Sequence, residues 1–387
     1  MHPIDRRVAV ERAMLDAAPH NLGEALAEQI RAQYGATSVE LHLADYHQNT
    51  LEPALDESGP ALPVVATAAG ESFTRQEILR RADDGHPVLY LPVSVRGNRI
   101  GVLTVHTAVP LPAAEIDELA GLATALGHAF AAAETATDRF HRARRRQRLT
   151  LAAEMEWQLL PGRGLDGPEF RLAGQLEPAY SVRGDSFDWA VEDGRLTLSV
   201  TNGFGEGVAA ALLTSLAVSA LRNARRAGLP PAEQMAMADQ AVWAYDNGAQ
   251  HVSTLLLELD LSSGRVSAVD AGSPAVWLLR GTELRRLRLD QQLPLGMFDG
   301  TVYTAERFGL EPGDRLVLLS DGVVDANRNG RRYAEQGVPR VIRSTRLLPP
   351  AEVVRGMISD LLVFYGGGGL DDDAAVVCLD WLGKNGG

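Results

Sequence analysis

Residues 315–323, RLVLLSDGV, join an apolar strand pattern to an acidic turn. The run 315–319 is typical of a buried strand, and Asp321 follows it beside Gly322. An Asp–Gly pair after a strand is usually only a turn. A carboxylate at a strand end next to glycine also suits a hard cation, because glycine lets the backbone approach closely. The segment therefore predicts a strand and makes Asp321 a candidate site residue.

Two other acidic segments share this design. Asp185 lies in the stretch 183–188, RGDSFD, and an aspartate triplet at 371–373 comes directly before the strand pattern 374–379. Taken singly, each is more simply a turn or a solvated loop. Carboxylates that converge repel one another, so a true cluster would imply Mg²⁺ or Mn²⁺. Two such ions side by side can promote phosphoester hydrolysis.

The pattern from residue 170 onward consists mainly of strands with helices between them. Strands are expected at 170–176, 196–200, 254–259, 265–270, 276–279, 315–319 and 374–379. Helices are expected at 207–227, 231–245 and 351–365. Runs of strands with segregated helices favour an α+β fold in which sheets pack together and helices lie outside.

Short motifs in this half occur in a recognisable order. They are AAEMEWQLLP (152–161), RGDSFD (183–188), GEGVAAAL (205–212), DAGSP (270–274), PLG (294–296), GD (313–314), SDGV (320–323) and DDAA (372–375). In this order, residues 150–382 resemble the bacterial PPM-type, metal-dependent Ser/Thr phosphatases of the stage II sporulation group. The resemblance implies a β-sandwich flanked by helices and a regulated hydrolase. Its usual substrate would be a phosphorylated anti-sigma-factor antagonist.

The resemblance also implies which residues carry the site. Asp185, Asp321 and Asp372 match family metal ligands and would be the catalytic groups. Asn202 and Gly203 stand where the family has an Asp, which bridges both ions, and a residue that ligates through its carbonyl. The family holds two Mn²⁺ or Mg²⁺ ions. Asn202 offers only a neutral amide oxygen, so this chain would hold two ions, one or none.

Further departures leave the activity open. Glu206, Ser273 and Ala375 stand where the family has His, His and Thr, and Asp188 or Glu206 would be candidates to restore the lost charge. One hypothesis is a phosphatase acting on a phosphoprotein in signal transduction. The alternative is a catalytically degenerate module that keeps the fold and binds a partner, or has a repurposed site. Asn202 is the residue that separates these hypotheses.

The first third of the chain predicts a separate domain. Two apolar strand patterns, 87–95 and 99–106, are joined by a short turn and precede a long helical pattern. This order resembles a GAF-type sensor domain over residues 1–133, with an antiparallel sheet. Such domains usually dimerise through flanking helices and bind small molecules. Four histidines are candidates for a ligand pocket, although strand histidines are more often simply hydrogen-bonded: His42, His47, His86 and His106.

A helical pattern runs from 113 to 160 without proline. We expect one long signalling helix, with residues 134–162 connecting the sensor domain to a phosphatase domain at 163–387. Its apolar stripe either packs on its own domain or needs a second copy, and we expect a homodimer along 113–160: Leu119, Leu122, Leu126 and Phe130. The arginine cluster between 139 and 148 is more simply a solvated helix face than a nucleic-acid patch.

Composition limits the remaining function classes. A length of 387 residues suggests two or three domains, and 37 Lys and Arg against 50 Asp and Glu give a net charge of −13. This charge disfavours nucleic-acid and anionic-membrane partners. The single cysteine, Cys378, excludes an intrachain disulfide and a multi-cysteine zinc site. Residues 1–12 lack the apolar core of a signal peptide, and the longest apolar stretch, 119–133, is too short to span a bilayer, so we expect a cytoplasmic protein.

Overall fold

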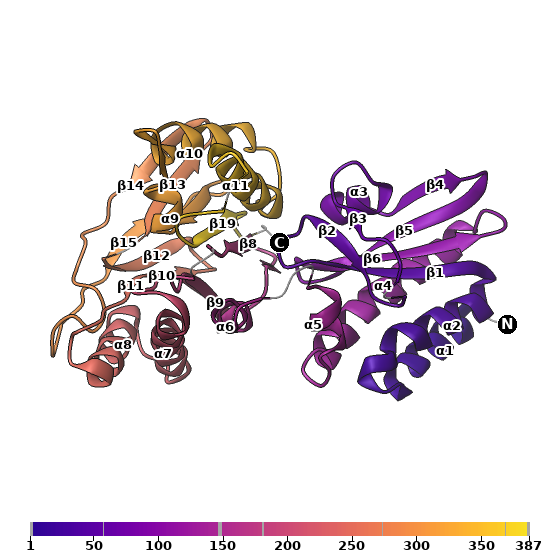
Figure 1. Ribbon diagram of the computed structural model, residues 1–387, viewed down its shortest axis with the longest axis horizontal. Helices are drawn as coiled ribbons and strands as arrows, with labels where there is room; N and C mark the ends of the chain where they lie inside the picture. The colour runs from indigo at the N-terminus through magenta and orange to yellow at the C-terminus, as the bar shows by residue number, and fades with distance from the viewer. Residues whose placement is uncertain are drawn as a thin grey trace. The chain divides into compact units, whose positions relative to one another are not determined.

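The computed structural model describes residues 3–56, 58–145, 149–179, 182–272, 274–367 and 369–384. The chain divides into two compact units between residues 148 and 149 (Figure 1). Each unit has hydrophobic core clusters made of its own residues. The two units are therefore described separately.

The N-terminal unit is built on a six-stranded antiparallel sheet with strand order β3-β2-β1-β6-β5-β4. Its strands are β1 (Ala36–Ala44), β2 (Thr50–Pro53), β3 (Leu62–Pro63), β4 (Leu79–Asp83), β5 (His86–Val95) and β6 (Asn98–Thr107). Its helices are α1 (Pro3–Asp16), α2 (Leu22–Tyr34), α3 (Ala68–Arg75), α4 (Ala113–Ala133) and α5 (Arg139–Ala143). The predicted hairpin is β5–β6, whose strands pair from Val88 to Val95.

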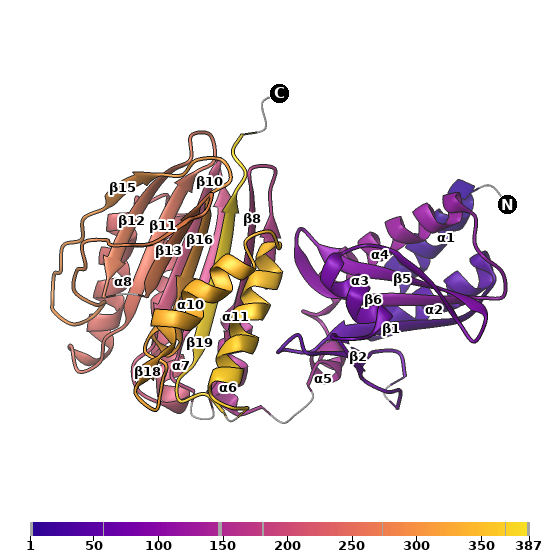
Figure 2. The ribbon, with the colours of Figure 1, turned by 90° about the horizontal axis from the view of Figure 1, so that it is seen from above.

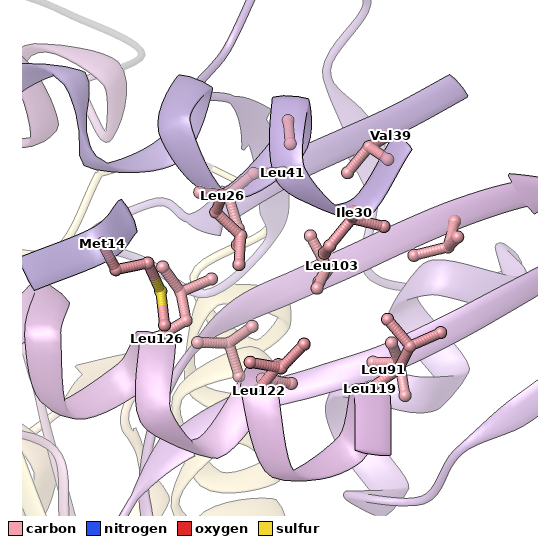
Figure 3. Packing of buried hydrophobic residues seen from close by; sticks show 14 of the residues in the cluster. Met14, Leu26, Ile30, Val39, Leu41, Leu91, Leu103, Leu119, Leu122 and Leu126 are labelled. Carbon is pink, nitrogen blue, oxygen red and sulfur yellow. The ribbon is translucent and has the colours of Figure 1, made fainter. Parts of the chain in front are cut away.

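The apolar stripe of α4 lies inside this unit. Leu119, Leu122 and Leu126 are fully buried. They belong to one core cluster with Met14 of α1 and Leu26 of α2, as Figure 3 shows. The stripe is therefore covered by the unit's own helices and sheet, and the prediction that it needs a second copy of the chain is wrong.

The pattern over residues 113–160 forms three helices rather than one: α4, α5 and, in the second unit, α6 (Leu151–Leu159). The hydroxyl of Thr135 donates to the carbonyl of Ala132, and that of Thr137 accepts from the backbone N–H of Arg139. Such local bonds compete with helix continuation. Phe140 then packs on Phe130, with ring centroids 4.4 Å apart. The predicted single helix is wrong because the chain turns back onto its own core.

The C-terminal unit contains two antiparallel sheets packed face to face. The five-stranded sheet, in the order β15-β12-β11-β10-β9, contains β9 (Ser186–Glu192), β10 (Arg195–Asn202), β11 (Ser253–Asp260), β12 (Arg265–Ala271) and β15 (Glu306–Gly309). The six-stranded sheet, in the order β14-β13-β16-β19-β8-β7, contains β7 (Gly164–Asp166), β8 (Phe170–Glu177), β13 (Ala275–Arg280), β14 (Glu283–Leu287), β16 (Arg315–Leu319) and β19 (Ala374–Trp381). One core cluster takes Leu198 and Leu257 from the first sheet and Leu316 and Val377 from the second. This arrangement is the expected sandwich.

Helices cover both outer faces of the sandwich. Residues of α7 (Gly207–Arg226) and α8 (Pro231–Asp246) share a cluster with the five-stranded sheet. Residues of α10 (Tyr333–Ser344) and α11 (Pro350–Phe364) share another with the six-stranded sheet, and Figure 2 shows these two helices lying over β19. The short helix α9 (Asp321–Val324) and the hairpin β17 (Asn327–Arg328) and β18 (Arg331–Arg332) come between β16 and α10.

One helix in the described part of the chain, α7, is long and apolar enough by length and composition to cross a membrane. Several of its side chains, including Leu213, Ala217 and Leu221, are buried in the cluster that joins α8 to the sheet. An apolar helix with such a buried face is equally typical of a protein core.

Candidate functional site

Asp185 and Asn202 come together because β9 and β10 are antiparallel neighbours. Thr201 of β10 pairs with Ser186 of β9, and Asn202 and Asp185 are the next residues beyond this last pair. Directly opposed residues of an antiparallel pair have Cα atoms about 4.5 to 5.5 Å apart and side chains on the same face. Asp185 is 1% exposed and Asn202 is 5% exposed. Two oxygen-bearing side chains therefore lie together inside the end of one sheet.

Asp321 and Asp372 reach the same region from the other sheet. The backbone N–H of Ser320 donates to the carbonyl of Ala375 at 3.0 Å, which extends the β16–β19 ladder up to Asp321. A Cβ on Gly322 would lie 2.0 Å from the carbonyl oxygen of Asp373, so only glycine lets α9 begin against this segment. The Asp–Gly pair thus places Asp321 beside Asp372.

The three carboxylates interact across the two sheets. Burial and then repulsion from Asp321 raise the pKa of Asp185 well above its usual range, and Asp372 adds to the effect. Burial and then the charge of Asp321 raise the pKa of Asp372 to about 6. Burial also raises the pKa of Asp321. A bound cation would relieve this repulsion and favour the ionised carboxylates.

Two buried oxygen atoms in this cluster point to a cation. Neither Oδ2 of Asp185 nor Oδ1 of Asn202 has a hydrogen-bond partner within the described residues. Buried acceptors are nearly always satisfied by protein, water or an ion. Within the ranges described above, no three His, Cys, Asp or Glu side chains are arranged to hold a metal ion. Within the described residues, the carboxylates therefore do not by themselves form a ready-made metal site.

Gly203, the other candidate ligand position, lies tightly against the loop before β9. A Cβ on Gly203 would lie 2.3 Å from the carbonyl oxygen of Arg183 and 2.6 Å from the Cα of Gly184. The close approach requires glycine at position 203. This contact joins the end of β10 to the loop that carries Asp185.

Asp373 fixes that same loop from the other sheet. It is fully buried, and its carboxylate accepts from the backbone N–H groups of Ala179 at 2.7 Å, Arg183 at 2.5 Å and Gly184 at 2.9 Å. Hydrogen bonds to an ionised acceptor are stronger than neutral ones. Asp373 therefore positions Asp185, a role that the aspartate triplet in the sequence did not reveal.

A second residue that sequence reasoning missed is Glu156 of α6. It is 1% exposed, and burial followed by the charge of Asp373 raises its pKa to about 10. Glu156 is consequently protonated at neutral pH. The sequence did contain a signal for this residue, because Glu156 is an acidic residue between Ala153 and Trp157 on the buried side of α6.

Arg183 places a cation at the edge of the cluster. Its Nε atom lies 3.7 Å from Oδ1 of Asp372, and its Nη2 atom lies 3.8 Å from Oε1 of Glu206 at the start of α7. The sequence analysis quoted Arg183 only as part of a motif. The structure makes it the positively charged neighbour of the candidate ligands.

Asp188 cannot replace the missing charge, contrary to one expectation. Its carboxylate accepts from Arg222 at 2.7 Å and from Arg225 at 2.9 Å, both on α7. Arg222 also donates to the carbonyl of Leu159 at the end of α6. Asp188 therefore holds α7 and α6 to the sheet. The other positions that depart from the family pattern include Ala375, buried in β19, and Ser273, which lies outside the described residues.

A cavity of about 490 Å³ lies beside Asp321. Its lining includes Arg286 of β14, Arg332 of β18, Trp277 of β13 and Glu335 of α10. Two exposed arginines and an aromatic side chain therefore flank the acidic cluster on a chain whose net charge is −13.

The four N-terminal histidines differ in their surroundings. His42 is buried, and burial lowers its pKa. His106 lies 3.4 Å from Glu40, while His86 is exposed. This unit also contains a cavity of about 100 Å³. Among the described residues, Arg80, Val88 and Ile116 help to line it, and none of the four histidines does.

Comparisons with known proteins concern the C-terminal unit. Residues 192–382 match the model of the family described as Stage II sporulation protein E. Phosphoserine phosphatase RsbP of Bacillus subtilis (strain 168) is 25% identical over 160 residues, which cover 39% of this chain and 40% of that protein. Protein IcfG of Synechocystis sp. is 23% identical over 216 residues, which cover 49% of this chain and 34% of that protein. This chain thus spans less than half the length of either relative.

Solved structures show similar but distant architectures. The RsbU and RsbW domains of Rv1364c from Mycobacterium tuberculosis give a TM-score of 0.49 at 23% identity, over 57% of this chain and 62% of that one. The SiaA-PP2C domain of Pseudomonas aeruginosa gives a TM-score of 0.49 at 20% identity, over 54% of this chain and 85% of that one.

Proposed function

Starting from the match of residues 192–382 to the Stage II sporulation protein E family, we propose that this chain is a regulated, metal-dependent protein Ser/Thr phosphatase. One observation carries the proposal. The charge of Asp321 raises the pKa of Asp185 and Asp372, and buried oxygens of Asp185 and Asn202 have no hydrogen-bond partner among the described residues. The similarity to a phosphoserine phosphatase supports the reaction class.

The donor set fits Mn²⁺ or Mg²⁺, which prefer oxygen ligands. Asp185, Asp321 and Asp372 would hold the ion through carboxylates, with Asn202 contributing its amide oxygen and Gly203 its backbone carbonyl. A divalent cation there supplies Lewis-acid stabilisation of a phosphate ester. The protein's own residues supply the positioning, since Asp373 fixes the loop that carries Asp185.

The cavity beside Asp321 supports a phosphoprotein as the substrate. The lining contains three acids, Asp321, Asp325 and Glu335, and two arginines, Arg286 and Arg332. The two guanidinium groups can pair with a phosphate group, and Trp277 offers an apolar surface. The family resemblance implies that the substrate is a phosphorylated anti-sigma-factor antagonist or a similar signalling protein.

We also propose that the N-terminal unit is a GAF-type sensor that binds a small molecule and regulates the phosphatase. Its six-stranded antiparallel sheet with helices packed against it supports this proposal. Homodimerisation belongs to the same proposal, because GAF-type domains usually dimerise, and we also propose a cytoplasmic location. The net charge of −13 supports the absence of nucleic-acid and anionic-membrane partners.

The competing function is a catalytically inactive binding module. Asn202 favours it, because an amide oxygen brings no negative charge to the site. Measuring phosphate release from a phosphoserine peptide and from an aryl phosphate, with Mn²⁺ varied, separates the two functions.

For wild type we expect Mn²⁺-dependent turnover, and for Asp321→Asn a loss of about 100-fold or more, the scale of losing a transition-state interaction. Asp371→Asn is the matched control, because Asp371 is the exposed member of the triplet and should leave the rate unchanged. Wild-type protein that releases no phosphate at any Mn²⁺ concentration would favour the binding module.

A further inference from the structure

The cavity of about 100 Å³ in the N-terminal unit lies at the β4 edge of the sheet. Its apolar wall includes Leu89 of β5, Leu111 in the segment before α4, and Ile116 near the start of α4. Leu89 and Ile116 belong to the core cluster that joins α4 to the sheet, and Leu111 packs against that cluster. The cavity therefore borders the unit's own hydrophobic core.

The segment between β6 and α4 is held in place beside the cavity. The hydroxyl of Thr107 donates to the carbonyl of Val109 at 2.8 Å, and both Thr107 and Pro110 line the cavity. Proline fixes its own φ angle, and Pro112 directly precedes α4. This wall is therefore ordered before any ligand binds, which lowers the entropic cost of binding.

Arg80 supplies an unpaired positive charge at the rim. It lies opposite Leu89 in the β4–β5 ladder, so both side chains are on the same face of the sheet. Arg80 is exposed, and its guanidinium makes no hydrogen bond or ion pair within the described part of the chain. The neighbouring Arg81 differs, because its Nη2 atom lies 3.0 Å from Oε2 of Glu71. Arg80 is therefore free to bind an anion.

Acidic side chains do not compete for this charge inside the cavity. Among the described residues, none that lines it is acidic. Of the acids beside Ile116, Glu115 is paired with Arg6 at 2.8 Å, and Asp117 is exposed, so water screens its charge. An apolar wall with a free guanidinium at its rim suits an anion that carries an apolar tail.

The volume limits the length of that tail. An apolar cavity of about 150 Å³ holds one benzene molecule, so a cavity of about 100 Å³ has room for about four carbon atoms. The side of the sheet that α3 covers offers a ligand less room, because Phe73 and Val102 are fully buried there in a packed cluster.

We propose that this cavity binds a short-chain monocarboxylate, whose tail contacts Leu89, Leu111 and Ile116 and whose carboxylate pairs with Arg80. The planar guanidinium fork matches a carboxylate. This inference deepens the proposed sensor function and rests on it in taking the N-terminal unit as the one that binds a small molecule.

Saturation-transfer NMR titration of the full chain with isovalerate tests the inference. We expect saturable binding to wild type. Arg80→Gln should weaken it by about tenfold or more, the scale of losing a hydrogen bond to a charged group. Isovaleramide, which has the same tail without the charge, should bind wild type about as weakly as isovalerate binds that variant. Leu111→Phe should abolish binding by filling the cavity.

Arg75→Gln is the matched control. Arg75 is an exposed arginine of the same unit that pairs with Glu71 at 3.1 Å and is not among the residues that line the cavity. Its replacement should leave the affinity unchanged. Thermal unfolding gives a second readout, since isovalerate should raise the unfolding temperature of wild type and Arg75→Gln but not of Arg80→Gln or Leu111→Phe.

Four results would overturn the inference. They are no saturable binding of isovalerate to wild type at millimolar concentrations, equal affinities for wild type and Arg80→Gln, unchanged binding to Leu111→Phe, and octanoate that binds more tightly than isovalerate. Binding as predicted that leaves phosphate release unchanged would contradict the proposed regulation and leave this site standing. Phosphate release by a chain that does not bind isovalerate would contradict this inference alone.

Discussion

The three consecutive aspartates at 371–373 occupy three different environments. Asp371 is exposed, Asp372 is half-buried in the acidic cluster, and Asp373 is fully buried with three backbone N–H donors. The donors to Asp373 lie about 190 positions earlier in the chain. Local sequence therefore identifies an acidic segment, while tertiary contacts decide which aspartate binds and which one holds the loop.

Glu156 should make stability depend on pH. Its pKa rises from an ordinary 4.5 to about 10 on folding, chiefly through burial. Between these values the folded chain holds one proton more than the unfolded chain, so stability falls as pH rises across this window. The Glu156→Gln variant has no titratable group at this position, so it lacks this pH dependence. Urea unfolding should therefore show the variant to be more stable than wild type by about 1 kcal/mol or more near pH 8, with a smaller difference near pH 5.

The matched control for this prediction is Glu154→Gln, two residues earlier on α6 and half-buried. It should leave the pH profile unchanged. Equal profiles for wild type and Glu156→Gln would show that Glu156 ionises normally in the folded protein.

Part of the site could be predicted from the sequence. Asp185, Asp321 and Asp372 are marked by strand ends, glycine and motif order, and in the structure the charge of Asp321 raises the pKa of both Asp185 and Asp372. The roles of Glu156 and Arg183 could not be predicted, because they depend on which segments the two sheets bring together. The sequence around Glu156 and around Arg183 does not show that Asp373 and Asp372 will lie beside them.

At the scale of elements, α7 is attached to the sandwich by the ion pairs of Asp188. Asp188→Asn removes a 3%-exposed charge that Arg222 and Arg225 both contact. Leaving two arginines without their carboxylate should cost about 3 kcal/mol of unfolding free energy, as measured by urea titration. Because Arg222 also binds the end of α6, hydrogen exchange in that helix should increase as well.

Glu258→Gln provides the control in the same sheet. Glu258 pairs at 3.5 Å with Arg195, whose side chain is 60% exposed, so its loss should cost less than about 1 kcal/mol. Equal losses for the two variants would mean that the Asp188 network contributes no more than a surface pair.

The elements expected in the C-terminal half were predicted well, and the three helices match α7, α8 and α11 within one residue at each end. The seven predicted strands of the C-terminal half all correspond to strands in the two sheets, because buried strands appear as apolar runs. Helix α10 was missed since Gly337 and Pro339 lie within it. Gly337 is needed there, because a Cβ would lie 2.1 Å from the ring of Tyr333. The long helix at 113–160 failed because periodicity cannot show which neighbour covers an apolar face.

At the scale of the whole molecule, the two units have separate cores. We propose that the N-terminal unit senses a small molecule and that the C-terminal unit is the phosphatase. The N-terminal unit buries the α4 stripe internally, so any dimer must use other surfaces. The C-terminal unit holds the acidic cluster at the ends of β9, β10, β16 and β19. A regulatory signal must therefore reach residues such as Asp185 through the loops and helices that hold them, among which α6 contributes Glu156.

Anomalous diffraction from crystals of the full chain grown with MnCl₂ tests the central claim most directly. We predict manganese at this cluster, with oxygens of Asp185 and Asn202 within about 2.5 Å of it, the distance typical of hard cations and oxygen ligands. Asp321 or Asp372 should complete the set from the second sheet. A well-occupied manganese peak elsewhere, with none between Asp185 and Asn202, would contradict the account.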